Sequence, residues 1–254
     1  MNEKIDNYIN KFKKISKKKR IMSVSKSFGS VGLTFEKELN KSPDSMYFPD
    51  YYGVEIKCTT RYSNYPFYLF TVAFDGPTFP EIDRIVNKYG WFDKDFPDKK
   101  VLFTKLSVKQ KHKVNRKYYF KLDIDEENEK VYLLVYDLNG KQIEKESYIY
   151  TQSIFNHLIV KLNTLAIVYA SKKKANSETY FRYYKTIVYE LKSFEVFIKL
   201  LKEGIIIVDL ISRISKSGSD KGRYRNKNLV FSISKDNMEK LFNKIYEYDT
   251  DCKK

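Results

Sequence analysis

One ten-residue stretch, residues 48–57, constrains this chain more than any other, because it joins a strand pattern to a turn and to clustered charges. Residues 54–57 alternate apolar and charged side chains, which is the pattern of a half-buried strand. Residues two apart on a strand share a face, so Glu55 and Lys57 project together. The Tyr-Tyr-Gly segment before them contains a turn residue and can fold Asp50 back toward that face. The stretch therefore predicts two carboxylates and one ammonium group in a small volume.

Such a group of charges has a chemical use. Two clustered carboxylates repel each other unless a cation lies between them, and hard oxygen ligands suit Mg²⁺. A lysine beside them can hold or deprotonate a water molecule. Asp50, Glu55 and Lys57 are therefore candidates for a metal-dependent hydrolase site. The alternative is a solvated strand face, because short Asp-x4-Glu-x-Lys strings also occur by chance in charged proteins.

Length and charge limit the class of protein. At 254 residues the chain can form one large domain or two modest lobes, and 42% hydrophobic and 16% aromatic residues can fill a sizeable core. The formal net charge is +16. This excess favours a polyanionic partner such as nucleic acid, or an anionic membrane surface. A lysine-rich housekeeping protein is the alternative that charge alone leaves open.

Other cofactors and compartments are disfavoured by the same composition. Cys58 and Cys252 are too few and too far apart for a disulfide framework or a zinc site, and we expect both to be free thiols. His112 and His157 are the only histidines, which argues against zinc or histidine-based nucleophilic chemistry. The first residues are polar and basic, and no apolar run approaches transmembrane length. We expect a soluble cytoplasmic protein with no membrane partner.

Periodicity predicts a mixture of helices and strands. Apolar residues at helical spacing predict an amphipathic basic helix within residues 1–20, either a DNA-backbone-contacting arm or a solvated face. A dense run of β-formers, 67–74, is expected to be the central strand next to 54–57. The three lysines at 172–174 are interpreted as a solvated loop. Further helices are expected over 81–89, 152–162, 191–201 and 237–246, and further strands over 101–108, 118–124, 130–136, 165–170, 180–189, 205–214 and 229–234.

A short helix, 33–39, precedes the acidic strand and carries two more carboxylates. Phe35 and Leu39, four residues apart, define its buried side. Glu36 and Glu38 flank that side on opposite edges. Either glutamate could therefore supply a third acidic group to the candidate site.

A basic loop near the C-terminus is the second informative segment. Ser-Gly-Ser and a further glycine make it pliable, and only Asp220 offsets its positive charges. Arginine and lysine can meet guanine edges and asparagine can meet adenine, whereas the alternative is a phosphate-binding or solvated loop. The candidate DNA-binding residues are Arg213, Lys216, Lys221, Arg223, Arg225, Asn226 and Lys227.

The order of motifs along the chain resembles the MvaI/BcnI family of type II restriction endonucleases, which is related to the mismatch-repair nickase MutH. The likeness runs, with gaps, over most of the chain. It rests on Gly32-x2-Phe35-Glu36, Pro49-Asp50-x4-Glu55-Ile56-Lys57, Phe120-Lys121-Leu122-Asp123-Ile124-Asp125, Val208-Asp209-Leu210, Ser217-Gly218-x3-Gly222 and Asn237-Met238-Glu239-Lys240-Leu241.

The resemblance implies an α/β, mixed-sheet PD-(D/E)XK nuclease fold, with a catalytic and a recognition lobe around a DNA cleft. We expect one domain over 1–254 with interwoven lobes, 1–125 mainly catalytic and 126–254 mainly recognition. The resemblance also carries over an active site, choosing Glu36 rather than Glu38. Its residues are Glu36, Asp50, Glu55 and Lys57, with the Ile56 carbonyl as an extra metal ligand.

The activity implied is Mg²⁺-dependent, sequence-specific hydrolysis of double-stranded DNA, with Mn²⁺ able to substitute, leaving 5′-phosphate and 3′-hydroxyl ends. Family members resemble each other in acting as monomers on short CC-N-GG-like sites and nicking each strand in turn, and a cognate DNA methyltransferase is expected in the host. The recognition loop of one family member has His-Asp-His at the positions where this chain has 225–227, Arg-Asn-Lys. The resemblance therefore does not assign the target sequence. A MutH-like nickase and a non-catalytic nucleic-acid-binding protein are the alternatives.

Overall fold

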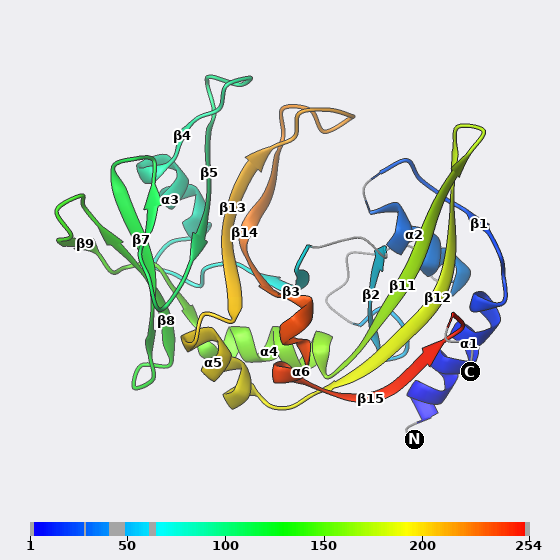
Figure 1. The fold of residues 1–254 in the computed structure, drawn as a ribbon. Coiled ribbons are helices and arrows are strands. Elements are labelled where there is room, and N and C mark those ends of the chain that lie inside the picture. The colour runs from blue at the N-terminus through cyan, green and yellow to red at the C-terminus, as the bar shows by residue number, and fades with distance from the viewer. Residues whose placement is uncertain (1–2, 28, 41–48, 61–64, 252–254) are drawn as a thin grey trace. The chain divides into compact units, whose positions relative to one another are not determined.

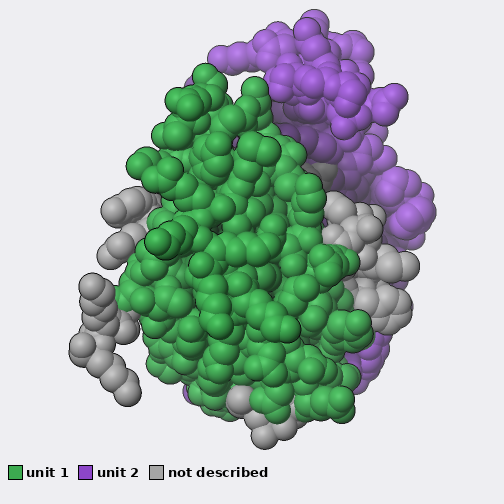
Figure 2. Space-filling model, turned by 90° about the vertical axis from the view of Figure 1, so that its right-hand side faces the viewer, with its two compact units in different colours: residues 1–65, 158–192, 238–254 green, residues 66–157, 193–237 purple. Residues whose placement is uncertain are grey.

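The chain passes repeatedly between two structural units. The computed structural model describes residues 3–27, 29–40, 49–60 and 65–251, with the side chain of Asn226 excepted. Unit 1 comprises residues 1–65, 158–192 and 238–254, and unit 2 comprises 66–157 and 193–237 (Figure 2). These bounds do not coincide with the expected division into 1–125 and 126–254, because a middle and a C-terminal segment both return to unit 1.

Unit 1 contains a five-stranded sheet in which the acidic strand has a parallel partner. The strand order is β1 (Ile21–Met22), β12 (Glu178–Leu191), β11 (Thr164–Ala175), β2 (Glu55–Thr60), and β15 (Phe242–Asp249) also pairs with β12. Strand β2 runs parallel to β11, with Glu55 opposite Leu165 and Lys57 opposite Ile167. The prediction that the 67–74 run lies next to β2 was wrong. The 67–74 run forms β3 (Phe67–Val72) in unit 2, because β-propensity marks a strand without selecting its partner.

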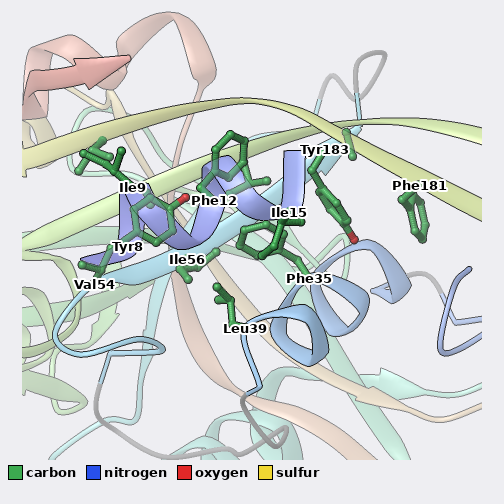
Figure 3. Packing of buried hydrophobic residues seen from close by; sticks show 14 of the residues in the cluster. Tyr8, Ile9, Phe12, Ile15, Phe35, Leu39, Val54, Ile56, Phe181 and Tyr183 are labelled. Atoms are coloured by element: carbon green, nitrogen blue, oxygen red, sulfur yellow. The ribbon is translucent and has the colours of Figure 1, made fainter. Parts of the chain in front are cut away.

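Two helices cover one face of this sheet. The apolar faces of α1 (Glu3–Ser16) and α2 (Ser30–Glu38) bury Tyr8, Phe12 and Phe35 completely in the core cluster that includes Ile56 of β2 (Figure 3). The rings of Phe12 and Phe35 lie 6.1 Å apart, and the Tyr8 hydroxyl hydrogen-bonds Thr186 Oγ1 at 2.7 Å. Each buried aromatic side chain contributes about 1.5–3 kcal/mol relative to an exposed one. This packing fixes α2 beside the acidic strand.

Strands β11 and β12 continue beyond the sheet as a hairpin (Figure 1). Its turn consists of Asn176 and Ser177, both with positive φ, 50° and 64°. Two such residues form the turn that matches the twist of a two-residue hairpin. The lysines at 172–174 belong to β11, so their interpretation as a loop was wrong. Pairing with β12 decides their conformation, whereas the local sequence shows only their charge.

Unit 2 contains two antiparallel sheets and three helices. One sheet has the order β3, β14 (Tyr224–Ile233), β13 (Ile206–Ile214), β5 (Lys100–Leu106), β4 (Trp91–Phe92). The other has the order β10 (Tyr148–Tyr150), β8 (Lys130–Tyr136), β7 (Tyr118–Asp125), β6 (His112–Val114), with β9 (Gln142–Glu144) also on β8. The helices are α3 (Glu81–Tyr89), α4 (Thr151–Leu162), whose last residues belong to unit 1, and α5 (Phe194–Lys202).

Helix α3 is joined to β9 by an ionic network. Arg84 bridges Glu81 at 2.6 Å and Glu144 at 2.5 Å, while Lys88 lies 2.5 Å from Glu144 and Tyr89 donates to the same carboxylate. Burial alone would raise the pKa of Glu144. The hydrogen bonds from Arg84, Lys88 and Tyr89 outweigh burial and lower that pKa to about 2. The network therefore needs Glu144 charged.

Most sequence-predicted elements are present, including α1, α3, α4 and the β7–β8 hairpin, but the last predicted helix is mostly strand. A 3₁₀ turn, Lys235–Asn237, and α6 (Met238–Leu241) precede β15, which pairs with β12. Sheet pairing overrides the helical spacing of 237–246 here. No helix in the described ranges is long and apolar enough to cross a membrane.

Candidate active site

Strand β2 places Glu55 and Lys57 in direct contact, as alternation predicts. Lys57 Nζ donates to Glu55 Oε1 at 2.5 Å. Glu55 is only 2% exposed, and its other oxygen, Oε2, is buried without a hydrogen-bond partner in the described part of the chain. Buried polar atoms are normally partnered, so an unpartnered carboxylate oxygen needs an explanation such as a bound ion. Glu55 Oε2 is the kind of oxygen that a divalent cation would satisfy.

A tight turn carries Asp50 back to the same strand. Tyr51 and Val54 exchange both backbone hydrogen bonds, at 3.0 and 2.9 Å, around Tyr52 and Gly53, which have positive φ values of 47° and 88°. Asp50 Oδ2 then accepts a hydrogen bond from the backbone N–H of Ile56 at 2.9 Å. The Asp50 carboxylate is thus held at the backbone between the two charged residues of β2.

Helix α2 presents its two glutamates to different surroundings. Glu38 forms an ion pair with Lys18 at 2.5 Å. Glu36 instead lies within electrostatic reach of Cys58 on β2: burial raises the pKa of that thiol, and the negative charges of Glu36 and Asp50 raise it further, whereas Lys57 lowers it. Glu36, Asp50 and Lys57 thus all lie within electrostatic reach of the Cys58 thiol, and the choice of Glu36 rather than Glu38 stays a prediction.

An open pocket of about 410 Å³ lies beside Asp50. It adds a cation, Lys11 of α1, that the sequence did not single out among the lysines of this helix. The only available signal was its place at the polar edge of an amphipathic helix. The pocket is lined by Lys11, Leu39, Asn40, Asp50, Tyr51 and Tyr52.

The carboxylates of the site fit a hard divalent cation whose coordination shell is completed by other ligands. Among the residues that the structure describes, no group of three or more His, Cys, Asp or Glu side chains is arranged to hold a metal. Asp50 and Glu55 supply two carboxylates. Mg²⁺ is commonly held by one or two carboxylates together with water and substrate phosphate. Thus the residues present suit a cation that binds together with a phosphodiester.

The predicted DNA-contacting residues gather on one hairpin of unit 2, and acidic side chains already pair with several of them. Lys216 contacts Asp93 and Asp95, and Lys227 lies 2.7 Å from Asp83 on α3. Arg223 lies 3.4 Å from Asp220. The set divides between the end of β13 (Arg213), the connecting loop (Lys216, Lys221, Arg223) and the start of β14 (Arg225, Asn226, Lys227).

Arg213 and Arg225 lie opposite each other on the two strands of the hairpin. The guanidinium of Arg213 stacks over the ring of Phe103 at 4.4 Å. Arg225, directly opposite Arg213 in the β13–β14 register, is exposed. The side chain of Asn226 lies outside the described part of the structure. Sequence alone missed the acidic partners, because Asp83 and Asp93 lie more than a hundred residues before the hairpin.

Comparison with solved structures places this fold among the nucleases. The structure of the restriction endonuclease MvaI in complex with its cognate DNA substrate matches with a TM-score of 0.87 and 25% identity, covering 96% of this chain and 98% of that one. The structure of MvaI without DNA matches with a TM-score of 0.59 and 22% identity over the same shares. No curated protein gives a significant sequence match.

A mixed sheet whose strand β2 carries Glu55 and Lys57, with Asp50 just before that strand, in a fold shared with these enzymes, defines a restriction endonuclease of the PD-(D/E)XK type. The chain belongs to the MvaI/BcnI restriction endonuclease family, whose model matches residues 9–242. It is accordingly a type II site-specific deoxyribonuclease, and the family generally uses a divalent metal.

Proposed function

We propose that this enzyme uses Mg²⁺ to hydrolyse both strands of double-stranded DNA at a short specific sequence, leaving 5′-phosphate and 3′-hydroxyl ends. The observation that carries the metal assignment is the buried, unpartnered Glu55 Oε2, set beside Lys57 and the tethered Asp50. The DNA in the MvaI complex supports the choice of substrate.

Each residue of the site has a distinct proposed role. Asp50 and Glu55, with the Ile56 carbonyl, would hold Mg²⁺ or Mn²⁺. The ion, when bound, would stabilise the charge that develops on the scissile phosphate. Lys57 positions the attacking water and helps to remove its proton, and its 2.5 Å contact with Glu55 keeps its ammonium group at the site. Glu36 completes or braces the acidic shell.

Sequence choice is proposed to lie with the β13–β14 hairpin. Arg225 and Arg213 face each other across the two strands, and arginine can contact guanine bidentately. Lys227 already has a carboxylate partner, so we assign it to positioning the strand or contacting phosphate. A short, pseudo-palindromic CC-N-GG-like site is the proposal that follows from family membership.

The biological setting follows from the same family membership. We propose that the enzyme acts as a monomer in the cytoplasm. A cognate DNA methyltransferase would protect host DNA without forming a physical complex with the nuclease.

The test combines cleavage with site-directed variants. Purified enzyme is incubated with plasmid libraries and Mg²⁺, and the cut ends are sequenced to give the site and the cut position together. Asp50→Ala, Glu55→Ala and Lys57→Ala should each lose cleavage by at least about 100-fold, because each removes a group from the metal or from the water. Glu38→Ala is the matched control, since its carboxylate belongs to the same unit but pairs with Lys18.

The outcomes separate the alternatives. Linear product from supercoiled plasmid, without any partner protein, supports a restriction enzyme, whereas product that stays nicked supports a MutH-like nickase. Full activity of the Asp50 variant, or equal losses in the Glu38 control, would contradict the assignment of the site.

A further inference from the structure

The outer part of the β11–β12 hairpin has an unusual surface for a strand pair. Strand β11 is 12 residues long, and four of its first six residues are buried within the sheet of unit 1. From residue 171 onward its side chains are partly or fully exposed, and Lys172, Lys173 and Lys174 are all exposed. The two strands extend past β2 to their tight turn (Figure 1). This outer part, residues 171–182, is called the basic ribbon below.

The basic ribbon carries positive charge that is not neutralised locally. It contains Lys172, Lys173, Lys174 and Arg182 against the single acid Glu178, a net charge of +3. Arg182 forms an ion pair with Asp251 at 2.7 Å. Within the described ranges, no ion pair involves any of the three lysines, and their cross-strand neighbours are Phe181, Tyr180 and Thr179. The lysines are therefore available to an anionic partner.

Sheet register relates the basic ribbon to the active site. Lys57 lies opposite Ile167, so Ile167, Tyr169 and Lys173 share the sheet face of Glu55 and Lys57. Lys173 is six residues beyond Ile167, which corresponds to about 20 Å along the strand. B-DNA covers about 20 Å in roughly six base pairs. Both features belong to unit 1 and are joined through one strand.

The shape of the basic ribbon also fits DNA. A two-stranded β-ribbon is narrow enough to enter or follow a DNA groove. Its small turn residues, Asn176 and Ser177, add little bulk at the tip. Successive side chains on a strand point to opposite faces, so Lys172 and Lys174 lie on one face of the ribbon and Lys173 on the other, and together they can reach phosphates on either side of it.

We propose that Lys172, Lys173 and Lys174 bind the phosphate backbone of DNA that flanks the recognition sequence, several base pairs from the scissile phosphate. The inference rests on the proposed endonuclease function and adds a sequence-independent contact to it. Its effect is to hold the duplex against the face of β2, while sequence is read elsewhere.

The primary test is the salt dependence of binding to a random-sequence duplex of about 30 base pairs, measured without a divalent ion. The triple variant Lys172→Gln, Lys173→Gln, Lys174→Gln should show a shallower slope of log K against log salt, by up to about 2.7, since each lost phosphate contact removes about 0.9. Replacing the same three lysines by arginine should restore the wild-type slope, because arginine also binds phosphate.

The matched control removes the same number of positive charges as the ribbon variant, from other lysines of unit 1. Lys192, Lys240 and Lys244 are exposed elsewhere in unit 1, and their triple glutamine variant also removes three positive charges. An unchanged slope in the ribbon variant, or an equal change in this control, would overturn the proposal. Thermal melting of each variant checks that the fold is retained, and an unfolded ribbon variant is replaced by the three single variants.

Duplex length supplies a second test once the cut site is mapped. The ribbon variant should lose affinity for a long duplex centred on the site, but not for one of about 10 base pairs, which ends before the ribbon lysines. Equal losses on both duplexes would contradict the flanking assignment. Absence of cleavage by the wild-type enzyme would refute the proposed function instead, and would leave the salt slopes as an independent measurement.

Discussion

Removing the hydroxyl of Tyr8 is expected to loosen helix α1 from the sheet that carries the active site. Tyr8 is fully buried, and its hydroxyl bonds Thr186 Oγ1 at 2.7 Å, where Thr186 is equally buried. Tyr8→Phe leaves the threonine hydroxyl without that partner, which costs about 1–3 kcal/mol. Thr186→Val should cost a similar amount, because it leaves the tyrosine hydroxyl unpartnered instead.

The double variant distinguishes this explanation from a general loss of packing. Replacing both partners by apolar groups of similar shape removes the unpartnered atom, so the double variant should lose under about 1 kcal/mol. Urea unfolding of the four proteins gives the coupling energy, whose size should exceed about 1 kcal/mol, because the two single losses together are larger than the loss in the double variant. A melting temperature roughly 5 °C lower in each single variant is the corresponding thermal result. Losses that simply add in the double variant would refute the reasoning.

Four further predictions follow from the site and its surroundings. Glu36→Ala should slow cleavage at least about tenfold, whereas Glu38→Ala should leave the rate unchanged and cost at most about 1 kcal/mol of stability; equal rates would contradict the distinction. Arg225→Ala should lose discrimination at one base-pair position by about 1–3 kcal/mol, and Lys227→Ala should weaken binding evenly on all sequences, as competition binding will measure. Because the pKa of Glu144 is lowered from 4.5 to about 2, its contribution to stability is complete above pH 4.5 and is lost as the pH falls toward 2, and Glu144→Gln should flatten that dependence in urea titrations. Chelation of divalent ions should abolish cleavage and Mg²⁺ should restore it, while cleavage that persists in excess chelator would exclude a metal-dependent reaction.

The candidate site could be predicted from sequence where the signal is local. Glu55 and Lys57 are two residues apart on a strand, so alternation alone places their side chains together, and they do meet at 2.5 Å. The turn that returns Asp50 to the strand is also local. Glu36 could not be separated from Glu38 in this way, because the Glu38 ion pair depends on Lys18, which lies 20 residues before Glu38 in the connection after α1.

Sheet partners were beyond local prediction. Strand β2 pairs with β11, whose first paired residue lies 110 positions after Glu55, and no periodicity in either segment specifies that pairing. The C-terminal segment has helical spacing but is mostly strand, because β12 offers it an edge. Lys172–Lys174 were misassigned for the same reason. Strand pairing is a property of the assembled sheet, and charge or propensity read along the chain does not encode it.

Unit 1 is formed by three separate segments of the chain, and this has a consequence for the order in which its sheet can assemble during synthesis. Strand β2 lacks its partner β11 until more than a hundred further residues have been made, and β12 lacks β15 until the segment after α6 has been made. A nascent chain on the ribosome therefore carries the acidic residues without the sheet that holds them in place. The order of segments therefore delays assembly of the sheet around the candidate site until β11, β12 and β15 have all been synthesised.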